Sequence, residues 1–158
     1  EGRHEVTTEG GLDIISQEAK LKKAIDRFTD AGIISSVFID AEIDQIEAAA
    51  RIGARVCEIH TGPYAHAFHN KGRDSESPAV LAELEKIRLA GEAIRAHGMR
   101  FNAGHALNYF NVQPVARLVG IRELHIGHAI ISRAVFVGLR EAVREMKSLM
   151  REAQSFGR

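Results

Sequence analysis

The sequence contains one cysteine and three prolines, has no long hydrophobic run, and has charges that cancel. The lone Cys57 excludes an intramolecular disulfide framework and a cysteine-rich zinc site. Lys and Arg together number 21, as do Asp and Glu, so no basic excess favours nucleic acid or an anionic membrane. No segment approaches the ~20 apolar residues of a membrane helix, and the first residues lack a signal-peptide pattern. We therefore expect a cytoplasmic protein without nucleic-acid or membrane partners.

The 158 residues are 45% hydrophobic, which is enough for one domain with a buried core. Four short apolar and β-branched segments predict β-strands, at residues 34–40, 56–62, 100–105 and 123–131. Apolar residues at helical spacing predict helices before, between and after these strands, most clearly at 21–28, 40–50, 78–97 and 139–150. Asp40 is expected to cap the second of these helices. The polar stretch 63–77 is expected to be a solvated connection.

This alternation of helix and strand predicts parallel strands joined by right-handed crossovers. The strand segments begin about 30 residues apart, so eight such units need about 240 residues, near the ~250 typical of a closed (β/α)₈ TIM barrel. About four units and one preceding helix are visible here. The pattern leaves two α/β architectures open, namely part of such a barrel or an open doubly wound sheet.

Polar side chains gather where the predicted strands end. Ligand sites of parallel α/β folds occupy this edge because loops and helix N-termini converge there. The residues concerned are Asp40, Glu58, His60, Thr61, Asn102, His105 and His128. Several histidines beside a carboxylate predict an acid–base site.

Other chemistries fit these residues less well. His60, His105 and His128 are possible zinc ligands, but they belong to three separate strands and lack short ligand spacing, so we expect no metal. A serine nucleophile is disfavoured because no Gly-x-Ser-x-Gly segment exists. Cys57 lies in the middle of a strand and is interpreted as a core residue.

Glycines beside these residues suggest a phosphorylated ligand. The sequence TTEGG at 7–11 is rich in hydroxyls and glycine, and Gly-His pairs stand at 104–105 and 127–128. Glycine lets backbone N–H groups approach an anion closely, and a following helix adds the positive end of its dipole.

Five segments, in this order and spacing, resemble the pyridoxine 5′-phosphate synthase family. They are EVTTEGGLD at 5–13, FID at 38–40, EIHTG at 58–62 followed by Tyr64, NAGH at 102–105 and IGHAII at 126–131. The resemblance implies a (β/α)₈ barrel that forms a homo-octamer in the bacterial cytoplasm. It also implies condensation of 1-deoxy-D-xylulose 5-phosphate with 3-amino-2-oxopropyl phosphate, without metal or cofactor, to give pyridoxine 5′-phosphate, inorganic phosphate and water.

The resemblance also implies roles for individual residues. His105 matches the proton donor and Glu58 matches the glutamate that stabilises the transition state. The residues that match substrate-binding positions are Thr7 for the sugar phosphate, and Ala106, Gly127 and His128 for the aminoketone phosphate.

Ala106 departs from the family, which usually has glycine there. Alanine keeps the backbone N–H, but a positive φ at this position would cost roughly 1 kcal/mol.

By the same resemblance, residues 1–158 form the C-terminal part of a single TIM-barrel domain whose N-terminal strands are absent. The family's other general bases and phosphate-binding arginines belong to those strands, so the isolated chain is expected to be inactive. Two alternatives remain: another phosphate-binding barrel enzyme of isomerase or aldolase type, or a non-catalytic assembly fragment. A Schiff-base aldolase is disfavoured because none of the four strand segments contains lysine.

Overall fold

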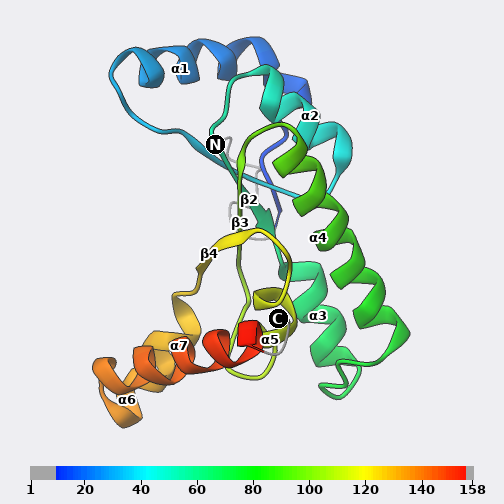
Figure 1. The fold of residues 1–158 in the computed structure, drawn as a ribbon, viewed down its shortest axis with the longest axis vertical. Helices are drawn as coiled ribbons and strands as arrows, with labels where there is room; N and C mark the ends of the chain where they lie inside the picture. The colour runs from blue at the N-terminus through cyan, green and yellow to red at the C-terminus, as the bar shows by residue number, and fades with distance from the viewer. Residues whose placement is uncertain (1–9, 156–158) are drawn as a thin grey trace.

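The computed structural model describes residues 10–155, which form one parallel sheet with helices around it (Figure 1). The strands are β1 (Ser36–Ile39), β2 (Val56–His60), β3 (Arg100–Gly104) and β4 (Ile121–His125). They lie in the order β1-β2-β3-β4, each parallel to its neighbour. The predicted α/β class is therefore confirmed. The strand order does not reverse within residues 10–155, whereas a complete doubly wound sheet reverses its order partway across.

The helices follow the predicted alternation and add elements to it. They are η1 (Ile15–Gln17), α1 (Glu18–Asp30), α2 (Ile43–Arg51), α3 (Gly62–Asn70), α4 (Pro78–Ala96), α5 (Val112–Ala116), α6 (His128–Val137) and α7 (Leu139–Ser155). Helices α2 and α4 lie side by side along the sheet, and α6 packs on α7 at the end of the molecule opposite α1 (Figure 1). None of the helices within 10–155 is both long and apolar enough to cross a membrane.

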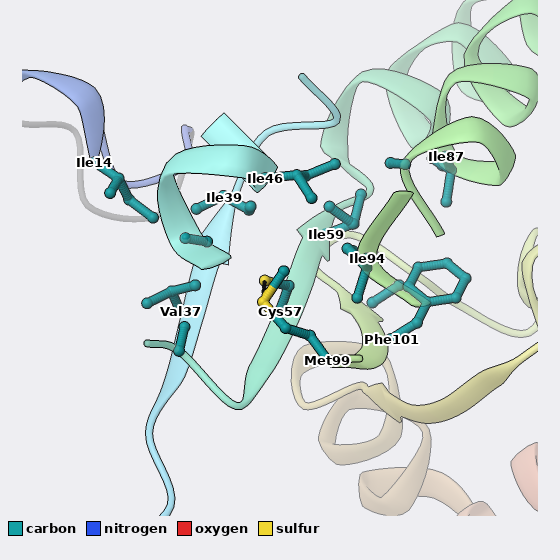
Figure 2. Packing of buried hydrophobic residues seen from close by; sticks show 14 of the residues in the cluster. Ile14, Val37, Ile39, Ile46, Cys57, Ile59, Ile87, Ile94, Met99 and Phe101 are labelled. Atoms are coloured by element: carbon teal, nitrogen blue, oxygen red, sulfur yellow. Dashed lines mark hydrogen bonds between the residues drawn. The ribbon is translucent and has the colours of Figure 1, made fainter. Parts of the chain in front are cut away.

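Alternate residues of the first three strands face α2 and α4 and form the core (Figure 2). Val37, Cys57 and Phe101 are neighbours in register, as are Ile39, Ile59 and Ala103 one step further along. Ile46 of α2 and Ile94 of α4 pack against these side chains. The prediction for Cys57 is confirmed, since it is fully buried and its burial raises the pKa of the thiol to about 12.

The residues between these core positions point to the opposite face of the sheet, because side chains alternate along a strand. Phe38, Glu58, Asn102 and Glu123 form one row across the four strands. His60, Gly104 and His125 form the next row toward the C-terminal edge. Five of these seven positions bear an ionisable or amide side chain, so this face carries the polar chemistry of the sheet.

The predicted fourth strand is wrong at its C-terminal end. The expected segment ran from 123 to 131, but β4 ends at His125 and α6 begins at His128, with Gly127 as its N-cap. His128 therefore lies in the first turn of a helix and not on a strand. A short apolar run does not distinguish a strand from a buried helix by periodicity alone.

Two further expectations from the sequence are corrected. The stretch 63–77 is not only a connection, because α3 covers Gly62–Asn70 and buries Tyr64 and Phe68. Asp40 does not cap α2, whose N-cap is Glu42. Its carboxylate instead accepts a hydrogen bond from the backbone N–H of Gly11 at 3.1 Å and contacts His60.

Candidate active site

A cleft of about 800 Å³ opens at the C-terminal edge of β2, β3 and β4. Five of the six predicted site residues line it, namely Glu58, His105, Ala106, Gly127 and His128. The sixth, Thr7, lies outside the described residues. The remaining lining residues are Phe38, Leu107, Asn108, His125, Ile126 and Ala129. Segments distant in sequence thus meet at one cavity, because the carboxyl ends of parallel strands share one edge of the sheet.

The turn after β3 presents His105 and Ala106 to this cleft in a left-handed conformation, with φ of 78° and 57°. The buried hydroxyl of Thr61 lies 2.6 Å from the carbonyl oxygen of Gly104 and 2.5 Å from that of His105, and is shared between them. From the other side, the Asn111 amide donates to the carbonyl oxygen of Ala106 at 3.2 Å. These bonds hold a conformation that residues other than glycine rarely adopt.

The ring of His105 belongs to a small aromatic group with His60 and Phe38. Its centroid lies 5.0 Å from that of His60 and 6.4 Å from that of Phe38. His60 is almost fully buried, and its Nδ1 lies 2.9 Å from Oδ1 of Asp40. His60, whose Nδ1 contacts Asp40, therefore packs against the ring of His105.

Glu58 makes the shortest ion pair of the cleft, with its Oε2 2.6 Å from Nδ1 of His125. His125 was not among the residues that the sequence predicted for the site. Burial lowers the pKa of His125, but the hydrogen bond and charge of Glu58, followed by those of Glu123, outweigh it, so the pKa is raised. His125 is the last residue of β4, and its place near the end of a predicted strand was the available signal. The register that pairs it with Gly104 cannot be inferred from the sequence.

The Gly127–His128 pair stands at the N-terminus of α6, where the first N–H groups of the helix have no partner within the helix. Such a terminus favours an anion. No lysine or arginine is among the residues that line the cleft. Backbone N–H groups and histidines are therefore the groups on this part of the chain that suit a phosphate.

His60 and His105 lie close together, but His128 does not complete a group of three metal-ligating side chains with them. Among residues 10–155, no three His, Cys, Asp or Glu side chains are grouped so that they could hold a metal ion. His60 turns instead to Asp40, while His128 begins α6.

A parallel α/β sheet with a glutamate, histidines and a helix N-terminus around one cleft at its C-terminal edge has the arrangement of an α/β enzyme. The family model described as "Pyridoxal phosphate biosynthesis protein PdxJ" matches residues 1–152. The chain belongs to this family.

Curated relatives agree with this assignment. A protein of Azoarcus sp. (strain BH72) named pyridoxine 5′-phosphate synthase is 82% identical over 153 residues, which are 97% of this chain and 61% of the relative. Proteins of the same name from Dechloromonas aromatica (strain RCB) and Magnetococcus marinus are 79% and 50% identical over 157 and 153 residues, covering 99% and 97% of this chain and 62% and 60% of those proteins. The chain thus spans about three-fifths of the length of these relatives.

Proposed function

We propose that this chain contributes to a pyridoxine 5′-phosphate synthase. The reaction condenses 1-deoxy-D-xylulose 5-phosphate with 3-amino-2-oxopropyl phosphate and releases inorganic phosphate and water. The observation that carries the proposal is the convergence of Glu58, His105, Ala106, Gly127 and His128 on one cleft. These are the residues to which the family resemblance gives roles, and three separate strand ends deliver them.

The chemistry of the cleft suits the steps of this condensation. Imine formation, loss of phosphate, loss of water and closure of the ring each move a proton, which histidine does best near neutral pH. His105 is the proposed proton donor to a leaving hydroxyl or a carbonyl oxygen. The carboxylate of Glu58 stabilises positive charge that develops on the substrate nitrogen.

The two phosphates serve as handles that place the reacting carbons next to each other. Gly127, His128 and the N–H of Ala106 are proposed to hold the aminoketone phosphate. Thr7, which the structure does not describe, is proposed to bind the sugar phosphate. No metal or organic cofactor enters these steps.

We further propose that residues 1–158 are the C-terminal part of one (β/α)₈ barrel. The unreversed strand order supports this, since a barrel adds each strand beside the last one. β1 and β4 are the edges of the described sheet. Helix α6 buries none of its residues although it is apolar, with Val135 78% and Phe136 83% exposed. Further strands and helices would cover these surfaces and supply the remaining bases and arginines.

The assembled protein is proposed to be a cytoplasmic homo-octamer.

The test uses the full-length protein with both phosphorylated substrates, and mass spectrometry to detect pyridoxine 5′-phosphate. We expect His105→Asn to lower turnover on the order of 10²-fold or more, because general acid–base groups contribute 10²–10⁴-fold. His97→Asn is the matched control, since His97 is exposed at the end of α4. Turnover lost to a chelator and restored by zinc, or product from one substrate alone by an aldol or isomerase reaction, would contradict the proposal.

The isolated 158 residues provide a separate test of the barrel proposal. They should lack synthase activity and should associate, because two sheet edges and the apolar side chains of α6 remain uncovered. Sedimentation of the purified chain, with an activity assay alongside, measures both. A stable monomer would contradict the proposed barrel, and a monomer with turnover would show that the catalytic bases are misassigned.

A further inference from the structure

We infer that His125 is a positioning residue for Glu58, holding its carboxylate across β3 and toward the cleft. The inference rests on the proposed function, in which Glu58 stabilises the transition state. Its geometric basis is the 2.6 Å approach of His125 Nδ1 to Glu58 Oε2. The two residues come from β2 and β4, which are not neighbours in the sheet, because β3 lies between them.

The contact depends on the absence of a side chain at position 104. Glu58 pairs in register with Asn102, whereas His125 pairs with Gly104, so the ion pair runs diagonally over β3. A Cβ atom on Gly104 would overlap Oε1 of Glu58 and would lie 3.1 Å from Cβ of His125. Glycine at this position therefore leaves the space through which the carboxylate reaches the histidine.

A second carboxylate fixes the other side of the His125 ring. Nε2 of His125 lies 3.5 Å from Oε2 of Glu123, and the same oxygen accepts a hydrogen bond from the Asn102 amide at 3.3 Å. Both imidazole nitrogens thus face a carboxylate, which favours the doubly protonated imidazolium. The raised pKa of His125 agrees with this arrangement.

The charge on His125 has a consequence for Glu58. A positive charge beside a carboxylate favours its ionised form and lowers the pH at which it takes up a proton. The carboxylate of Glu123 on β4 offsets part of this effect, and His105 and His128 line the same cleft. His125 therefore orients the carboxylate of Glu58 and places a positive charge beside it.

Two substitutions in the full-length protein separate orientation from charge. His125→Gln keeps a hydrogen-bond donor without the charge, and His125→Ala removes both. We expect the acidic limb of the kcat/KM profile to move up by about 1 pH unit in both variants. We expect kcat to fall on the order of 10-fold in His125→Ala and less in His125→Gln, with KM for either substrate little changed. His97→Gln, the matched control, should leave profile and kcat unchanged.

Histidine titration by NMR tests the pairing without any assay of turnover. His125 should titrate above its ordinary pKa in the wild-type protein and move toward that value in Glu58→Gln. A His125 titration that Glu58→Gln leaves unchanged would overturn the inference, and so would a His125→Gln profile that overlays the wild type. If the protein lacks synthase activity while the NMR result holds, the proposed function fails and the pairing stands as structure alone, which removes the catalytic role inferred for His125.

Discussion

The imidazole ring of His60 lies against that of His105, with ring centroids 5.0 Å apart and an angle of 57° between the planes. Nδ1 of His60 contacts Asp40 at 2.9 Å, while its Nε2 has no hydrogen-bond partner among the described residues. The carboxylate of Asp40 accepts a hydrogen bond from Nδ1–H of His60. Asp40 therefore fixes the plane of the ring that packs against His105.

Removal of this support should destabilise the fold. We expect Asp40→Ala to lower the free energy of unfolding by about 1–3 kcal/mol, because Nδ1 of the buried His60 loses its partner. Asp40→Asn should cost less, since the amide oxygen still accepts a hydrogen bond. Urea unfolding of the full-length protein measures both. Asp26→Ala, which breaks only an exposed pair with Lys22, is the control and should cost at most about 0.5 kcal/mol.

The hydroxyl of Thr61 should contribute to both the stability of the protein and its kcat. Thr61→Val keeps the shape of the side chain but leaves the carbonyl oxygen of His105 without that donor. We expect a loss of about 1–3 kcal/mol in the free energy of unfolding, together with lower kcat because the turn that carries His105 loosens. Thr61→Ser retains the hydroxyl and should recover most of the kcat. Equal effects of valine and serine would contradict this role.

Much of the fold was predictable because its signals are local. Apolar periodicity correctly placed α1, α2 and α4, and the glycines that follow these helices, Gly32, Gly53 and Gly98, take positive φ. The end of β4 was not predictable, because apolar residues recur from Leu124 to Ile131 on both sides of Gly127 and support strand or helix equally. Helix α3 was missed because its few apolar residues, including the buried Tyr64 and Phe68, are followed by the polar stretch 69–77, with which they were grouped as one connection.

In the candidate site, too, residues with a local sequence signal were predicted and residues whose contacts are distant in sequence were not. Glu58 and His105 were named in advance because they follow the motif of a family, and the structure brings both to one cleft. His125 was missed because its contact with Glu58 depends on strand register and on a missing side chain at Gly104, which no local pattern reveals. Asp40 was misread as a helix cap because its actual partners, Gly11 and His60, are distant in sequence.

Gly91 is expected to be essential for the packing of α4 on the sheet. A Cβ atom at this helical position would overlap the ring of the buried Phe101. We expect Gly91→Ala to destabilise the protein by about 1–3 kcal/mol through overpacking, despite the better helix propensity of alanine. In combination with Phe101→Leu the penalty should be less than the sum of the two single changes, because the smaller side chain leaves room. An additive double variant in urea unfolding would show that the two residues do not compete for space.

Ala106 is the position where a single change should stabilise the protein. Its φ of 57° lies in the left-handed region, where the Cβ of alanine is strained and glycine is not. We expect Ala106→Gly to raise the free energy of unfolding by about 0.5–1 kcal/mol, since the relief of strain exceeds the added freedom of the unfolded chain. The backbone N–H and the carbonyl bond to Asn111 remain, so phosphate binding should persist. Ala82→Gly, on the exposed side of α4, makes the same chemical change in a helix and should instead cost about 1 kcal/mol. If urea unfolding shows that Ala106→Gly and Ala82→Gly change the free energy of unfolding in the same direction, the left-handed conformation at Ala106 is contradicted.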